Sequence, residues 1–201
     1  FKKYIRIKKK HINKVNFYIK KKFKKNKILG ILIRGTTQKI TTKHQMPVEP
    51  SQLIPMINKV VKNENCNKIF LVTEDLKYFN LIKKVYKNKI IFNKSFRANV
   101  NFYQNHAEIF NVYPRNLHRY KLGKEILIDT LMLSNCDVLL YSDSNVSRAA
   151  ILFSKKKQKK YFIQTENNSS NIFIARWKWY IKTFLSGYLF GIKYKLIKKN
   201  Y

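Results

Sequence analysis

Residues 28–37 read Ile-Leu-Gly-Ile-Leu-Ile-Arg-Gly-Thr-Thr, a short apolar run that ends in an arginine, a glycine and two threonines. An apolar run of this kind is typical of a strand buried on both faces, as strands of parallel sheets are. Open α/β sheets bind their ligands beyond the carboxyl ends of their strands. We therefore expect Arg34, Gly35 and Thr36 to face a ligand-binding crevice.

The rest of the chain alternates short apolar runs with helical patterns. A helix is expected after Pro50, with Ser51 able to cap it and a regular part that starts near Ile54 because of Pro55. Further strands are predicted over 68–72, 89–92, 138–141 and 161–164, and further helices over 76–86, 124–135 and 146–153. This alternation predicts an α/β fold with a Rossmann-like, mainly parallel sheet and helices on both faces.

Composition divides the chain into three parts. Residues 1–27 hold thirteen Lys or Arg and no acidic residue, and they predict a basic amphipathic helix that leads into the first strand. Residues 28–165 form the predicted Rossmann-like domain. Residues 166–201 predict a basic, aromatic-rich helical tail, too short and too charged to read as a transmembrane helix. This tail fits a helix lying in a membrane interface, and the alternative is a helix packed against a missing half of the protein.

The charge of the chain is extreme, because 43 basic residues stand against 10 acidic ones among 201 residues, a net charge of +33. Such a field attracts polyanions such as nucleic acid, anionic lipid or phosphorylated ligands. Only seven of the basic residues are arginine, and an AT-rich genome would also impose abundant lysine, so a merely solvated surface is the alternative. The two cysteines make no disulfide framework and no signal-peptide pattern is present, which predicts a cytoplasmic location with peripheral membrane association as an option.

Polar groups follow four of the predicted strands, and parallel strands bring their carboxyl ends to one edge of the sheet. The Arg34 guanidinium offers a fixed fork of donors that suits a diphosphate, and an ion pair with Glu74 or Asp75 is the alternative. Ser144 and Asn145 begin a helix whose free N–H groups favour a phosphate, although Ser144 also fits a plain N-cap. The four segments are 34–36, 73–75, 142–145 and 164–165.

Asp129 is a lone carboxylate in the otherwise apolar helical segment 126–133. Burying a carboxylate without hydrogen-bond donors is costly. A guanine base could supply those donors through its ring N–H and its amino group. A structural bond to a neighbouring backbone group or to Arg119 is the alternative.

At this point the residues resemble those of a known family, the fucosyltransferase superfamily, which contains α1,6-fucosyltransferases, nodulation fucosyltransferases and protein O-fucosyltransferases. Residues 29–37 with 43–45 resemble its His-x-Arg-x-Thr-Asp phosphate motif. Two more segments resemble later motifs in the same order: 69–75, and 123–137 continued by 144–147.

The resemblance implies the donor-binding C-terminal half of a GT-B glycosyltransferase, with GDP-fucose as donor, a saccharide acceptor, inversion at the anomeric carbon, and neither metal nor other cofactor. Carried over, Arg34 would hold the β-phosphate and be the residue on which transfer most depends. Asp129 would bind the guanine edge, Ser144 would bond a phosphate oxygen, and Asp75 would help to order the donor site. Arg119 falls where the family also has an arginine.

The sequence departs from the family pattern at three points. Leu32 stands where the family has its histidine, Thr37 stands where it has an aspartate, and the loop after Arg34 lacks the glutamate of the α1,6 enzymes. An acceptor hydroxyl needs a base within hydrogen-bond reach, and His44 and Glu49 are the candidates in this chain. A nucleotide-sugar-binding protein with weak activity is therefore a second interpretation.

Two other functional classes are open. A basic nucleic-acid-binding module would explain the charge and the aromatic content, but no helix-turn-helix, zinc spacing or RNP motif is present, so no specific nucleic acid is expected as a partner. A membrane-peripheral protein would use the tail 171–197 on an anionic membrane surface. The partners expected first are a nucleotide sugar and a saccharide acceptor.

Overall fold

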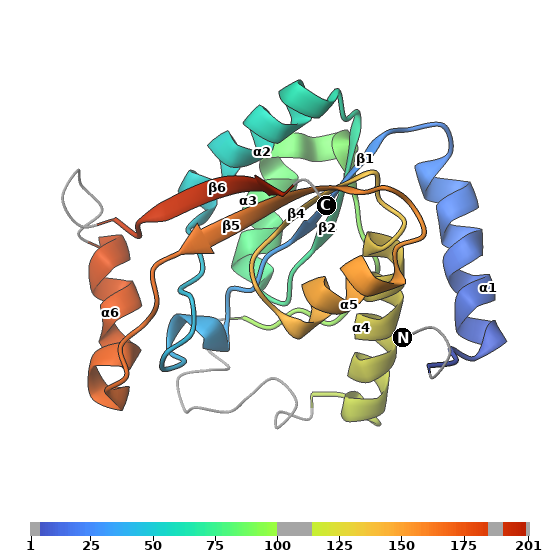
Figure 1. Ribbon diagram of the computed structural model, residues 1–201. Helices are drawn as coiled ribbons and strands as arrows, with labels where there is room; N and C mark the ends of the chain where they lie inside the picture. Colours follow the sequence, from blue (N-terminus) through green and yellow to red (C-terminus); the bar gives the residue numbers. More distant parts are fainter. Residues whose placement is uncertain (1–4, 100–113, 185–190, 200–201) are drawn as a thin grey trace.

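A computed structural model describes residues 5–99, 114–184 and 191–199 (Figure 1). Six strands of these residues form one sheet in the order β3-β2-β1-β4-β5-β6. Strands β1 to β5 are parallel to their neighbours, and β6 pairs antiparallel with β5. The strands are β1 (Ile28–Leu32), β2 (Lys68–Val72), β3 (Ile90–Ile91), β4 (Val138–Tyr141), β5 (Lys159–Thr165) and β6 (Tyr194–Lys199).

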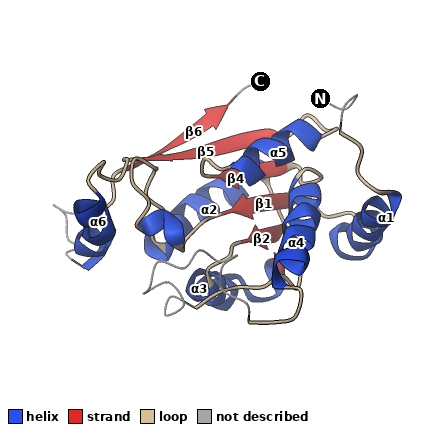
Figure 2. Cartoon of the chain, turned by 90° about the horizontal axis from the view of Figure 1, so that it is seen from below, coloured by secondary structure: helices blue, strands red, loops and turns tan. Residues whose placement is uncertain are grey.

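Helices cover both faces of the sheet, which confirms the predicted α/β class. One apolar core lies between the sheet and α2 (Pro50–Glu64) with α3 (Leu76–Tyr86). A second core lies between the other face and α1 (Lys9–Tyr18), α4 (His118–Leu133) and α5 (Asn145–Phe153). Helix α6 (Ile172–Phe184) stands at the opposite end of the molecule from α1 (Figures 1 and 2). Shorter helical turns occupy Ile19–Phe23, Thr37–Lys39 and Lys87–Lys89.

Strand β1 lies at the centre of the sheet, as its apolar sequence predicts, and all of its residues are buried. Gly30 within it allows α4 to approach closely. A Cβ at this position would stand 2.9 Å from Cys136 Sγ and 3.1 Å from Leu133 Cδ2, which is closer than side chains pack. The glycine therefore sets the spacing between the sheet and the helix that later forms a wall of the site.

Two helices begin earlier than predicted. Helix α2 starts at Pro50, because a proline in the first helical position needs no N–H acceptor. The residue before it, Glu49, takes the N-cap position in place of Ser51, and its backbone N–H donates to Gln52 Oε1 at 3.1 Å. Helix α4 starts at His118 and runs through Gly123.

The tail contains a helix and a strand. Helix α6 matches the predicted basic, aromatic-rich helix, whereas residues 194–199 form β6 on the edge of the sheet instead of continuing a helix. Lysines are common on such edges because they discourage further strand pairing. Residues 185–190 of the tail lie outside the described residues. Within the part that is described, no helix is both long enough and apolar enough to cross a membrane.

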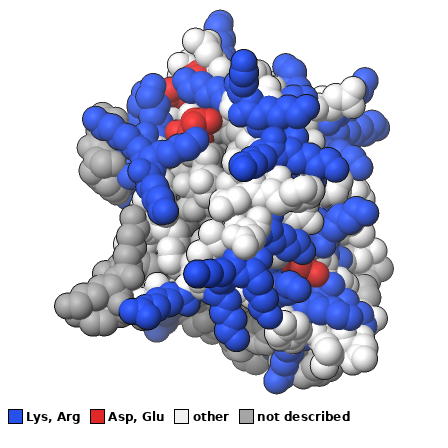
Figure 3. Space-filling model, turned by 90° about the vertical axis from the view of Figure 1, so that its right-hand side faces the viewer, with Lys and Arg blue, Asp and Glu red and all other residues white. Residues whose placement is uncertain are grey.

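The basic residues form no single stripe on the face where α1 lies. Figure 3 shows Lys and Arg side chains spread over this face, with only a few Asp and Glu among them. A broad positive field of this kind attracts anions without defining one binding groove.

Candidate functional site

A cavity of about 250 Å³ lies at the carboxyl ends of β1 and β2, beside the start of the helix that follows β4. The strand order reverses there, since β2 and β3 lie on one side of β1 and β4 to β6 lie on the other. Ligands of open α/β sheets bind at this topological switch point. We call it the switch-point cavity; its walls come from the ends of β1 and β2, from residues 95–96, from α4 and from the start of α5.

Arg34 lines the switch-point cavity and also forms the alternative ion pair. Its Nε lies 3.5 Å from Glu74 Oε1, and 42% of its side chain remains exposed. Glu74 Oε1 also accepts hydrogen bonds from Gly35 N at 3.2 Å and from Thr36 Oγ1 at 2.9 Å. Glu74 therefore fixes the loop after β1 and leaves the guanidinium at the cavity surface.

The place that a side chain would take at Gly35 is occupied by Asp75. A Cβ there would stand 2.8 Å from Asp75 Oδ2. Asp75 is fully buried, where its Oδ1 accepts from Tyr78 N at 3.1 Å and its Oδ2 pairs with Lys39 Nζ at 3.0 Å. Asp75 thus caps α3 and ties down the loop after β1, and it is not among the residues that line the cavity.

The start of α5 borders the cavity. Ser144 Oγ accepts from Ser147 N at 3.1 Å, and Ser147 Oγ accepts from Ser144 N at 3.1 Å. This reciprocal cap confirms the N-cap interpretation of Ser144. The N–H groups of Asn145 and Val146 have no acceptor within their own helix, because helices leave their first turn unpaired. Both residues line the cavity, where the positive end of the helix dipole favours an anion.

Asp129 is buried at the wall that α4 provides. Its Oδ2 accepts from Ser95 Oγ at 2.7 Å, whereas Oδ1 has no hydrogen-bond partner among the described residues. Burial raises the pKa of this carboxyl to about 6, against the opposing effect of the Ser95 hydroxyl, the Asn93 amide and the Arg97 charge. The carboxylate therefore has one buried oxygen without a donor, in a residue that lines the cavity.

Arg119 does not lie at this site. It is exposed near the start of α4 and is not among the residues that line the cavity. The positive charge that acts on Asp129 is that of Arg97, whose guanidinium stacks 3.9 Å from the centre of the Phe79 ring.

Sequence reasoning missed two polar residues of the cavity, Ser95 and Glu125. Glu74, which also lines the cavity, is expected from the sequence as an ion-pair partner of Arg34, and the structure shows this pair. Glu125 holds Arg115 through two hydrogen bonds of 2.7 and 2.8 Å and accepts from Phe96 N at 3.0 Å. No sequence pattern relates Ser95 or Phe96 to α4, because these contacts form only in the folded chain.

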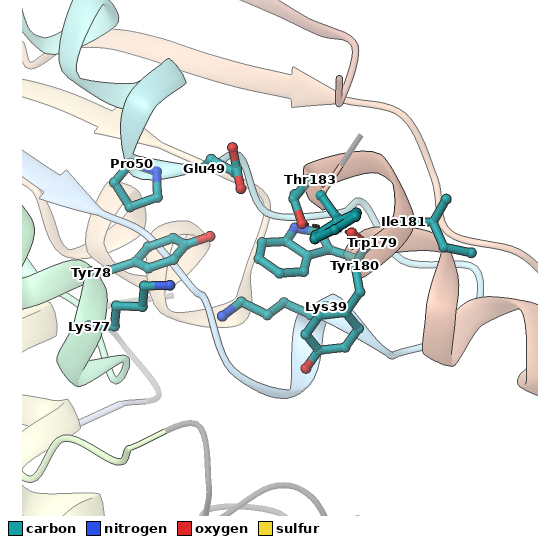
Figure 4. A pocket seen from close by; sticks show the side chains of 10 residues that line it. Lys39, Glu49, Pro50, Lys77, Tyr78, Trp179, Tyr180, Ile181 and Thr183 are labelled. Carbon is teal, nitrogen blue, oxygen red and sulfur yellow. Dashed lines mark hydrogen bonds between the residues drawn. The ribbon is translucent and has the colours of Figure 1, made fainter. Parts of the chain in front are cut away.

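A second, larger cavity of about 570 Å³ opens between α6 and the starts of α2 and α3 (Figure 4). We call it the aromatic cavity. Lys39 Nζ stands 4.9 Å from the Tyr78 ring centre and 4.6 Å from the Trp179 ring centre, and Glu49 and Lys77 add charged groups.

The two candidate bases lie apart from the switch-point cavity. Glu49 lines the aromatic cavity. His44 is exposed and lines neither cavity, and its carbonyl accepts from Asn168 N at 2.8 Å. In the described part of the chain no three His, Cys, Asp or Glu side chains gather as a metal site requires.

Comparison with known proteins finds a likeness in structure only. No protein-family model matches the chain, and no curated protein matches it. Among solved structures, the fucosyltransferase NodZ from Bradyrhizobium is 12% identical with a TM-score of 0.51, over 98% of this chain and 51% of that chain. NodZ crystallised with GDP gives 10% identity and a TM-score of 0.49, over 96% and 49% of the two chains. A mutant of FUT1 from Arabidopsis thaliana in complex with GDP is 11% identical with a TM-score of 0.41, over 76% of this chain and 32% of that chain.

The likeness is one of fold. The chain has the α/β architecture of part of the NodZ fucosyltransferase and spans about half the length of that protein. The resemblance predicted from the sequence motifs is thus confirmed at the level of the fold. The residue roles that it implies stay predictions.

Proposed function

We propose that this chain binds a nucleotide sugar, GDP-fucose, in the switch-point cavity and serves as the donor-binding half of a fucosyltransferase-like glycosyltransferase. Fucose would pass to a saccharide acceptor with inversion. The fold likeness to NodZ and the order of the sequence motifs both support this proposal.

The diphosphate would lie between Arg34 and the start of α5. Arg34 brings a half-exposed guanidinium to the cavity, and Asn145 and Val146 at the start of α5 line the same space. Donors of these two kinds are the ones that proteins use for phosphate oxygens. In the transfer step the same groups would stabilise the negative charge that develops on the departing diphosphate.

The single observation that carries the proposal is the buried Oδ1 of Asp129, which has no hydrogen-bond partner among the described residues. A buried carboxylate oxygen without a partner is costly, and few remain in native proteins without a reason. Guanine presents a ring N–H and an amino group side by side, and Asp129 can accept from them while Ser95 holds its second oxygen. Adenine presents no such pair of donors.

The acceptor would approach from the aromatic cavity. The exposed Tyr180 ring offers an apolar platform for the face of a sugar, and Glu49 offers a carboxylate that could take the hydroxyl proton. Glu49 is therefore the preferred base of this chain, ahead of His44.

Calorimetric titration with GDP and GDP-fucose tests the proposal. Both should bind the wild-type protein, and Arg34→Ala should weaken binding by about 10- to 100-fold, the value of a lost charged hydrogen bond. Arg148→Ala is the matched control, because Arg148 is an exposed arginine that pairs with Asp143 just before α5. Absence of binding by the wild type, or equal affinity in the Arg34 and Arg148 variants, would contradict the proposal.

A further inference from the structure

Helix α6 has one face packed on the protein. Ala175 and Trp179 are buried on this face, and Trp179 Nε1 donates to the Pro47 carbonyl at 2.8 Å. Trp179 also packs with Met46 and Ile192 in a small apolar cluster. The orientation of α6 on the molecule is therefore fixed.

The opposite face of α6 is apolar and exposed. Phe173 is 71% exposed, Trp177 66% and Phe184 89%. Residues four and seven positions apart share one side of a helix, so these three aromatic side chains form a continuous stripe. The other large apolar residues of α6, which are Ile172, Ile174, Tyr180 and Ile181, are exposed as well. Soluble proteins seldom leave so large an apolar patch in water unless it binds something.

The surroundings of this stripe are basic. No acidic residue follows Glu166 in the chain, while seven Lys or Arg do. Glu166 itself is paired with Lys182. The Arg176 guanidinium lies 6.0 Å from the centre of the Phe173 ring, beside the stripe. A partner for this surface must therefore have an apolar interior and a negatively charged surface.

We propose that α6 docks on an anionic lipid membrane and lies in the plane of its interface, with Phe173, Trp177 and Phe184 among the acyl chains. An apolar stripe rich in aromatic residues, flanked by Lys and Arg, is what interfacial helices share. The basic groups beside the stripe are attracted to the negative surface of an anionic leaflet. They would not favour binding to a neutral or basic protein surface. This inference does not depend on the nucleotide-sugar site.

The chain has only two tryptophans, one on each face of α6, which makes the docking directly measurable. The full chain is mixed with vesicles of phosphatidylcholine, or of equal parts phosphatidylcholine and phosphatidylglycerol. The fluorescence of the wild type should shift to shorter wavelength with the anionic vesicles only. Trp177→Phe should remove this shift, because the remaining Trp179 is already buried.

Sedimentation with the same vesicles gives the second readout. Phe173→Ser combined with Phe184→Ser should weaken vesicle binding by about tenfold or more, since two apolar side chains lose their burial. Phe17→Ser is the matched control, because Phe17 is a 62% exposed phenylalanine on α1, and it should bind as the wild type does.

Three results would overturn the inference. The first is no sedimentation with anionic vesicles, or equal sedimentation with neutral ones. The second is equal binding by the double variant and the wild type. The third is a fluorescence shift that follows protein concentration without lipid, which would assign the stripe to a second copy of the chain.

Discussion

Asp129 is the residue on which the proposed binding of guanine depends most. Its place in an apolar helix already marks it in the sequence as a carboxylate that needs donors. The sequence does not reveal that Ser95 supplies one donor, nor that the other oxygen is buried without a partner. The helical pattern fixes only the position of the side chain on its own helix, whereas Ser95 comes from a loop.

Asp129→Asn should change how stability depends on pH. The pKa of about 6 in the folded protein exceeds the ordinary value of 3.8, so the folded state binds more protons between these two values. The free energy of unfolding of the wild type should therefore fall as pH rises from about 4 to 6, by roughly 3 kcal/mol in total. The asparagine variant lacks this contribution and should be more stable than the wild type at neutral pH. Urea unfolding of both proteins across this pH range measures the difference, and parallel curves would refute the burial of an ionised carboxylate here.

Among the contacts between elements, those of Glu64 connect helix α2 to the edge of the sheet. Its carboxylate at the end of α2 pairs with Lys159 Nζ at 2.6 Å and Lys198 Nζ at 3.1 Å, and it accepts from Tyr161 Oη at 2.7 Å. These partners lie on β5 and β6, far along the chain. Residue spacing cannot reveal such a link, because it is created by the order of the strands.

Glu64→Gln should destabilise the protein by roughly 1 kcal/mol at neutral pH, because Lys159 and Lys198 lose their counter-charge and solvent screens both half-exposed lysines. Although burial acts to raise it, hydrogen bonds from Lys159, Tyr161 and Lys198 lower the pKa of Glu64 to about 2, from 4.5. This stabilisation is complete above the ordinary pKa and is lost as pH falls toward 2. Thermal unfolding measures the effect, with Tyr161→Phe as a comparison that removes only one hydrogen bond. A glutamine variant as stable as the wild type would show that the cluster contributes nothing.

Strand β1 and helix α4, which forms a wall of the switch-point cavity, approach each other closely at Gly30. Gly30→Ala would place a methyl group 2.9 Å from Cys136 Sγ, so α4 would have to move away from β1. We expect a loss of about 1–3 kcal/mol in the free energy of unfolding. Gly123→Ala is the matched control: nothing lies within 4 Å of its Cβ position, and alanine in a helix should stabilise by about 1 kcal/mol. Equal effects of the two substitutions would mean that the close approach does not matter.

The elements that the sequence predicts best are those with apolar runs between polar turns. The predicted ranges 68–72, 76–86 and 138–141 are the observed bounds of β2, α3 and β4. The sequence predicts neither strand β6 nor the first turns of α4, and the reason is the same for both. Residues 194–199 mix lysines with apolar residues on an exposed edge, and residues 118–123 carry few apolar side chains, so neither gives a clear periodic signal.

At the scale of the molecule, parallel topology explains how the sequence could predict that Arg34 and Ser144 lie at the same edge of the sheet. Arg34 and Ser144 are distant in the chain, yet each follows a central strand, and β1 pairs with β4 in parallel. Their convergence at the switch point follows from that pairing. The walls from residues 95–96 and α4 could not be foreseen, because their approach is set by packing. The net charge of +33 adds attraction for anions over the whole surface, but selectivity must come from the cavity.

We predict that the switch-point cavity selects a guanine nucleotide through Asp129. Calorimetric titration of the wild-type chain with GDP and with ADP, in the same buffer, measures this selectivity. The two ligands share the diphosphate that Arg34 and α5 would bind, so the difference reports the base alone. We predict that GDP binds at least about tenfold more tightly, because adenine would leave Asp129 Oδ1 buried without a donor. Equal affinity for GDP and ADP, or no binding of GDP, would contradict the account.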